Sequence, residues 1–120
     1  MVTVKNITFK SPEIVVQTLG KVYNHQYADF KTSYKVKRMC DRAGTLMSEY
    51  HTKLKSIQQS QDPEVMKAIP EKMRELDSEE NQIEWGPLTA DEIRGIALSP
   101  AELSILEPFV EEATYEKLSQ

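Results

Sequence analysis

The chain has very little of the residue types on which most metal and disulfide sites depend. Among its 120 residues, Cys40 is the only cysteine, and His25 and His51 are the only histidines. A single cysteine excludes an internal disulfide and a zinc site built from several thiolates. Neither histidine stands in a ligand spacing such as His-x3-His. We therefore expect no metal site and no cofactor.

Other absences argue against catalysis and against a membrane. The four glycines stand singly, so no glycine-rich phosphate loop is present, and no Gly-x-Ser-x-Gly elbow occurs. Adjacent carboxylates such as Glu79 and Glu80 point in different directions and do not form a catalytic pair. No run of about 18 apolar residues exists, and the first residues lack the apolar core of a signal peptide. These absences predict a cytosolic protein with no enzyme activity and no membrane partner.

The strongest pattern that is present is a long apolar repeat within residues 31–60. Its members recur at intervals of three or four and predict one helix with an apolar seam: Val36, Met39, Cys40, Ala43, Leu46, Met47, Tyr50, Leu54 and Ile57. Such a helix is roughly 40 Å long at about 1.5 Å per residue. We expect Cys40 to be an ordinary buried residue of this seam. A returning helix or a second copy of the chain can cover the seam.

A returning helix is predicted over residues 63–77. Asp62 followed by Pro63 is a helix start, because proline is favoured at the first helical position. An apolar stripe can then lie against the seam: Val65, Met66, Ile69, Met73 and Leu76. Pro70 should bend or divide this helix. The two segments together predict an antiparallel helical hairpin.

The N-terminal part predicts a strand followed by a helix. Apolar residues alternate over residues 1–10, with a change of parity near Asn6 that a bulge would explain. Ser11 as N-cap and Pro12 predict a helix over residues 12–24. We expect its buried face to consist of Val15, Val16, Leu19, Val22 and Tyr23.

The C-terminal part predicts a second strand and two short helices. Residues 82–86 alternate and can pair with the first strand. Thr89 with Glu92 and Ser99 with Glu102 are capping boxes, which predict helices over residues 90–95 and 100–107.

Weak periodicity over residues 111–120 predicts a frayed tail. The predicted fold is one α+β domain over residues 1–120, mainly α. Its long helix lies in an antiparallel hairpin that is braced by the N-terminal helix and a small antiparallel two-stranded sheet, with short C-terminal helices.

Charge is divided along the chain. Residues 1–60 hold ten basic and four acidic residues, a net charge of +6, whereas residues 76–120 hold two basic and eleven acidic residues, a net charge of −9. Either the two parts pack against each other or one of them meets a partner of opposite charge. So acidic an end disfavours DNA binding.

One basic face stands out on the predicted long helix. Lys31, Lys35, Arg38 and Arg42 follow an i, i+4, i+7, i+11 spacing and so share one side. It can be a solvated face, a dock for the acidic end or a phosphate-binding stripe. The residues predicted at a partner surface are Lys35, Arg38 and Arg42 on this helix and Phe109, Glu111 and Glu112 at the acidic end.

Two stretches resemble a known family. Residues 27–38 (YADFKTSYKVKR), followed by a long helix, and residues 93–110 (IRGIALSPAELSILEPFV), placed after a strand, resemble segments of a family of small, uncharacterised tailed-bacteriophage proteins. The likeness covers about residues 16–110. It implies a phage or prophage origin and expression in a bacterial cytosol, and it implies no activity.

The expected function is non-enzymatic binding of other proteins in a phage context. Small helical phage proteins commonly serve in virion or tail assembly, which is the first expectation by analogy. Inhibition of a host defence or transcription protein is the alternative within protein binding. A nucleic-acid-associated protein is the alternative from another class. Self-association through the long helix is a further expectation for the partners.

Overall fold

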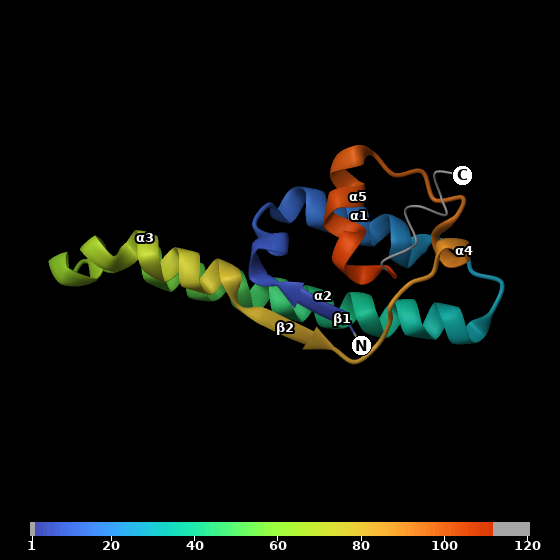
Figure 1. Ribbon diagram of the computed structural model, residues 1–120, viewed down its shortest axis with the longest axis horizontal. Helices are drawn as coiled ribbons and strands as arrows, with labels where there is room; N and C mark the ends of the chain where they lie inside the picture. The colour runs from blue at the N-terminus through green and yellow to red at the C-terminus, as the bar shows by residue number, and fades with distance from the viewer. Residues whose placement is uncertain (1, 112–120) are drawn as a thin grey trace.

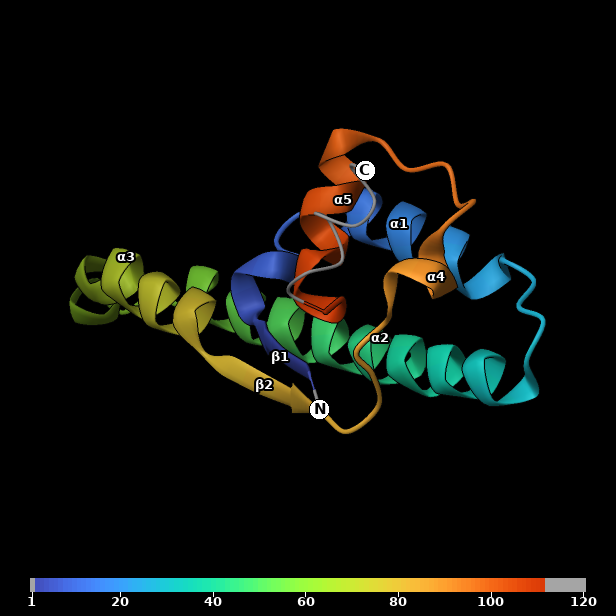
Figure 2. The same ribbon diagram turned by 45° about the vertical axis from the view of Figure 1, so that its right-hand side comes forward.

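The computed structural model describes residues 2–111 and has an elongated shape of 55 × 27 × 23 Å. The elements follow in the order β1, η1, α1, α2, α3, β2, α4, α5 and η2. Figures 1 and 2 show the long helix α2 running the length of the molecule, with α1, α3 and the sheet against it and α5 on the far side of α1. This mainly helical α+β architecture confirms the predicted fold class. Within residues 2–111, no helix is both long and apolar enough to cross a bilayer.

The helix α2 spans Phe30–Gln58, close to the predicted 31–60, and forms the spine of the fold. It begins where the Asp29 side chain accepts a hydrogen bond from the backbone N–H of Lys31, at 3.0 Å. That contact satisfies one of the N–H groups that have no partner inside a helix. The predicted seam is buried at each member from Val36 to Tyr50 except Met47, which is partly buried like Leu54 and Ile57.

The two strands β1 (Val2–Lys5) and β2 (Glu80–Ile83) pair antiparallel, with Val2 opposite Ile83. β1 is shorter than the strand predicted over residues 1–10, because residues Asn6–Phe9 form the 3-10 helix η1. Asn6 is buried, and its side-chain amide donates to Leu76 O at 2.8 Å. The change of parity near Asn6 therefore marks a turn, and the predicted bulge is wrong.

β2 also differs from its predicted bounds of 82–86, since it begins at Glu80 and ends at Ile83. The chain then leaves the sheet through Gly86, whose φ of 110° is in the region that favours glycine. A Cβ at this position would lie 2.8 Å from Val2 Cγ2, so a side chain would be excluded by space as well. Residue 86 therefore has to be glycine, and it lies outside the strand, which ends at Ile83.

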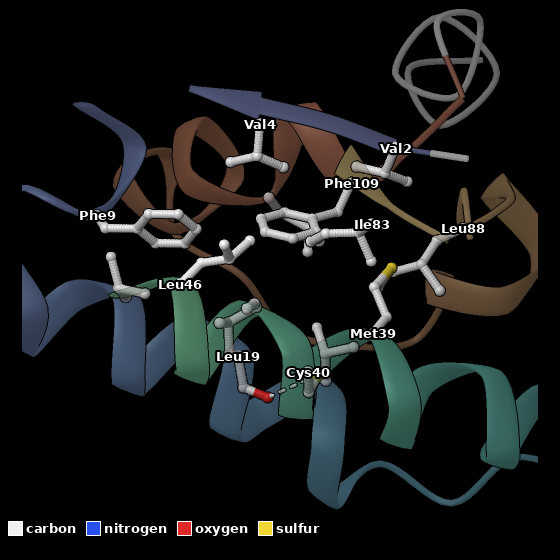
Figure 3. Close-up of a cluster of buried hydrophobic side chains, with 14 of the residues drawn as sticks. Val2, Val4, Phe9, Leu19, Met39, Cys40, Leu46, Ile83, Leu88 and Phe109 are labelled. Carbon is white, nitrogen blue, oxygen red and sulfur yellow. Dashed lines mark hydrogen bonds between the residues drawn. The ribbon is translucent and has the colours of Figure 1, made fainter. Parts of the chain in front are cut away.

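The core lies between the sheet, α2 and the C-terminal helices. Figure 3 shows Val2, Val4 and Ile83 of the sheet facing Met39 and Leu46 of α2, with Phe109 between them. All of these side chains are buried. Because the sheet turns Val2, Val4 and Ile83 toward α2, these apolar side chains and α2 exclude water from each other.

The helix α1 (Pro12–Asn24) packs against α2 and α5. Val15, Leu19 and Val22 form its buried face, as predicted. Val16 and Tyr23 are instead 59% and 46% exposed, so the predicted buried face was too wide. Ser11 is the N-cap residue, but its side chain forms no capping hydrogen bond. Of the two predicted start signals, only Pro12 at the first helical position is therefore in use.

The helix α3 (Pro63–Ser78) returns along the end of α2 and continues through Pro70 without being divided. We name residues 51–78, the end of α2 with α3, the arm, and the remainder of residues 2–111 the body. The hairpin is as predicted, and Figure 1 shows the arm projecting beyond the other elements. Met66 of the predicted stripe is nevertheless 53% exposed.

A buried polar cluster joins the arm to the body. Asp77, near the end of α3, accepts from the Tyr50 hydroxyl at 2.5 Å and from Lys10 Nζ at 3.0 Å. Burial raises the pKa of Asp77, but these hydrogen bonds outweigh it and the pKa is lowered overall. Tyr50 has its own pKa raised by burial and by Asp77. The cluster holds an ionised carboxylate at the base of the arm.

The C-terminal elements are α4 (Ala90–Ile93), α5 (Pro100–Leu106) and the 3-10 helix η2 (Glu107–Phe109). Both predicted capping boxes are confirmed, although each helix ends before its predicted limit of 95 or 107. The predicted frayed tail over residues 111–120 lies outside the described residues apart from Glu111.

The carboxylate of Glu102, in the second capping box, also serves the tertiary structure. It is 1% exposed and accepts from Lys21 Nζ at 2.8 Å. The hydrogen bond from Lys21, with that from the backbone of Ser99, lowers the pKa of Glu102 to about 2. One side chain thus caps α5 and fastens it to α1.

Candidate functional site: an aromatic and arginine surface beside the sheet

One exposed side of α2 carries a row of aromatic and arginine side chains. Phe30, Tyr34, Arg38 and Arg42 are spaced by four residues, so they follow one another along one face of the helix. Phe30 is 82% exposed and stacks on Tyr34 with ring centroids 6.2 Å apart. Large aromatic rings this exposed have not been used to build the core.

The single tryptophan joins this row from the segment after β2. Trp85 meets Tyr34 edge-on, with ring centroids 5.3 Å apart. The guanidinium carbon of Arg38 lies 5.6 Å from the centroid of the Trp85 ring, within the range of a cation–π contact. We name Phe30, Tyr34, Arg38, Arg42 and Trp85 the aromatic–arginine surface. The tertiary structure assembles it from two parts of the chain.

A groove of about 430 Å³ runs beside this surface, between α2 and the strand β2. Arg38, Asp41, Arg42 and Thr45 line it from the helix, and Gln82, Glu84 and Trp85 line it from the strand side. Asp41 is held by Lys37 Nζ at 2.7 Å, which raises the pKa of Lys37. Within residues 2–111, no carboxylate forms an ion pair with Arg38 or Arg42.

The Lys35 side chain, unlike those of the two arginines, is bonded to another element of the fold. Its Nζ lies 2.7 Å from Glu92 Oε1 and donates to Pro87 O at 3.2 Å. Burial raises the pKa of Glu92, but the hydrogen bonds from Lys35 and Thr89 lower it more. Lys35 thus holds α4 on α2, whereas Arg38 and Arg42 are exposed and form no ion pair with a carboxylate of residues 2–111.

The predicted acidic end does not form a surface with Phe109. Phe109 has no exposed area and lies in the core, so its prediction as a partner-surface residue is wrong. Its backbone carbonyl accepts from Leu88 N at 2.8 Å. Glu111 is exposed, and its backbone N–H donates to Leu88 O at 3.0 Å. Glu112 lies outside the described residues.

Ion pairs join the basic and acidic parts of the chain at three places. They connect Lys10 with Asp77, Lys21 with Glu102 and Lys35 with Glu92. The division of charge along the sequence thus serves internal packing to this extent. Arg38 and Arg42 lie outside these pairs and, with Lys31, are the exposed residues of the basic face that a partner can reach.

The other side chains with reactive or ligating groups are tied into the fold. Burial raises the pKa of Cys40 to about 12, so its thiol is protonated near neutral pH. His51 Nε2 lies 2.7 Å from Phe9 O. No three histidine, cysteine, aspartate or glutamate side chains among residues 2–111 gather as a metal site would require.

Comparisons of the chain with protein-family models, curated proteins and solved structures found no match.

Proposed function

We propose that the protein is a non-enzymatic protein-binding component of a tailed bacteriophage or prophage that acts in virion or tail assembly in the bacterial cytoplasm. The observation that carries the proposal is the aromatic–arginine surface. Tryptophan, tyrosine and arginine dominate the energetic centres of protein interfaces, because they combine large contact area with directional polar groups. The resemblance of residues 27–38 and 93–110 to phage proteins supplies the biological setting.

A protein partner fits this surface better than a nucleic acid does. Arginines beside aromatic rings also occur where single-stranded nucleic acid binds. Here, however, Asp41 and Glu84 line the same groove, and the formal net charge of the chain is −4. Carboxylates this close to the arginines repel phosphates. A protein segment can offer carboxylates to the arginines and neutral or basic groups to Asp41 and Glu84.

Site-specific cross-linking tests the proposal. A photo-reactive phenylalanine analogue replaces Tyr34 in one version of the full chain and Lys67, an exposed residue of the arm, in a control version. Each version is produced in bacteria in which the source phage is multiplying, and cross-linked products are identified by mass spectrometry. We expect a virion or tail protein to be captured from position 34 and not from position 67. Arg38→Glu should reduce the capture about tenfold or more, because it reverses a charge at the contact.

Four results would contradict parts of the proposal. Equal products from both positions, or none from position 34, would remove the aromatic–arginine surface as a binding site. A host enzyme as the product would retain protein binding but replace assembly by inhibition of that enzyme. Retention of a labelled oligonucleotide at low salt, with affinity falling steeply as salt rises, would favour the nucleic-acid alternative.

A further inference from the structure

The strand β2 has one free edge. The sheet within residues 2–111 has two strands, and β1 occupies only one side of β2. β1 is itself flanked by η2. Figures 1 and 2 both show β2 at the outer margin of the molecule, with β1 between it and the C-terminal helices. The free edge of β2 is the place where this sheet can be extended.

The pairing register tells which backbone groups point outward from this edge. Asn6 N–H donates to Glu79 O at 3.0 Å, and the same register continues to Val2 opposite Ile83. Hydrogen-bonded pairs alternate along an antiparallel ladder, so Asn81 and Ile83 face β1. The N–H and C=O groups of Glu80 and Gln82 therefore face away from the sheet. No backbone hydrogen bond from another loop or turn of residues 2–111 reaches them.

The groove described above lies beside this edge. Its strand-side lining includes Gln82 and Glu84, and its helix-side lining comes from positions 38, 41, 42 and 45 of α2. Neighbouring strands lie about 4.8 Å apart, so a third strand next to β2 would lie over this flank of α2. The sheet already covers α2 with Ile83, and an added strand would extend that cover across Arg38 and Arg42.

The charges at the edge select the kind of strand that fits. A strand turns alternate side chains to opposite faces, so one set would meet Arg38 and Arg42 and the other would lie outside. The set facing the two exposed arginines should carry carboxylates, which guanidinium groups bind in bidentate geometry. A second copy of β2 is disfavoured, since Glu80 and Glu84 of both copies would then approach each other.

We propose that the free edge of β2 binds an extended segment of another protein as a third strand, with acidic side chains at alternate positions directed at Arg38 and Arg42. This deepens the proposed function and rests on it. The main-chain hydrogen bonds of Glu80 and Gln82 supply affinity, and the arginines with Trp85 supply specificity. The mode of recognition is strand addition to a sheet edge.

A peptide-display selection on the full chain tests this inference without knowledge of the natural partner. Random peptides of about ten residues are selected on the immobilised protein, and the enriched ones are synthesised and measured by fluorescence anisotropy. We expect acidic residues at alternate positions. Methylation of the peptide's backbone nitrogens should be informative, because only every second N–H faces the neighbouring strand. One alternating set of N-methyl groups should weaken binding at least about tenfold, and the other set at most about twofold.

Variants of the protein complete the test. Arg42→Glu should weaken binding about tenfold or more, whereas Lys67→Glu on the arm should leave it within about twofold. Arg42 is exposed, so the Arg42→Glu variant should retain the wild-type unfolding midpoint. Measuring this midpoint checks that the variant is folded.

Each other outcome overturns the inference. No enriched peptide, equal sensitivity to both sets of N-methyl groups, or binding unaffected by Arg42→Glu rejects strand addition at this edge. A mass in solution that is twice that of one chain, and that Arg42→Glu returns to the mass of one chain, would show that two β2 edges pair in a dimer. That result would assign the edge to a second copy instead. Capture of a virion protein from position 34 together with failure of the peptides leaves the proposed function standing and removes only this inference.

Discussion

The body and the arm share one helix, and they differ in how that helix is covered. In the body, Met39 and Leu46 of α2 lie beneath the sheet and are at most 3% exposed. In the arm, Leu54 and Ile57 belong to the same seam but are only partly buried where α3 returns along α2. Apolar periodicity therefore predicts where a helix needs a cover, and it does not predict how complete that cover is. Completeness depends on how many other elements converge on the seam.

The largest expected difference between the two regions is the cost of removing a leucine. Leu46→Ala should lower the free energy of unfolding by about 2–5 kcal/mol, because a buried site loses both transfer free energy and packing. Leu54→Ala should cost about 1 kcal/mol, since a partly exposed side chain loses less on removal. Urea unfolding of both variants measures the two values. Equal costs would mean that the arm is as well covered as the body.

A second, smaller effect tests the polar cluster at the base of the arm. Tyr50→Phe removes one donor from the buried carboxylate of Asp77 and should lower the free energy of unfolding by about 1–3 kcal/mol. The matched control is Tyr34→Phe, which removes a hydroxyl from an exposed ring and should change stability by less than about 0.5 kcal/mol. A similar loss in both variants would show that the Tyr50 hydroxyl does not hold the cluster.

The pH dependence of the same variant follows from the lowered pKa of Asp77. A carboxyl whose pKa is lower in the folded state stabilises the fold above its unfolded pKa of about 3.9, and this contribution is lost as the pH falls through the folded pKa. Without the Tyr50 hydroxyl the folded pKa of Asp77 is less lowered. Tyr50→Phe should therefore lose less stability than the wild type when urea unfolding at pH 7 is compared with unfolding at pH 3.

The smallest effect is expected on the exposed side of the arm. Met66→Lys should change the free energy of unfolding by no more than about 0.5 kcal/mol, because the side chain is already half in water. Urea unfolding at two protein concentrations provides the measurement. A loss above about 1 kcal/mol that grows with concentration would reveal a second copy covering Met66 in solution.

Most of the secondary structure could be predicted because its signals are local. Proline at the first helical position set the starts of α1 and α3, and two capping boxes set those of α4 and α5. The 3-10 helix η1 could not be foreseen, because Asn6 turns the chain in order to reach Leu76, 70 residues away. The exposure of Val16 and Met66 could not be foreseen either, because it depends on which other elements pack against α1 and α3.

The candidate site could be predicted only in part for the same reason. Spacing along one helix identified Arg38 and Arg42, but the basic face also included Lys35, which is paired with Glu92. Trp85 was interpreted as a strand residue, and its contact with Arg38 requires the register of the sheet against α2. One local signal pointed to Trp85: it is the single tryptophan of the chain and stands next to Gly86 and Pro87.

The pairing of β1 with β2 has a consequence for how the chain is made. The backbone of Val2 and Val4 leaves the ribosome before the strand that pairs with it, which includes Ile83. Synthesis proceeds at about 5–20 residues per second, so β1 has no partner strand for several seconds in a newly made molecule. The completion of this sheet is thus a late event of biosynthesis. A chain stopped before residue 80 has no partner strand for β1, which chaperones or proteases can then recognise.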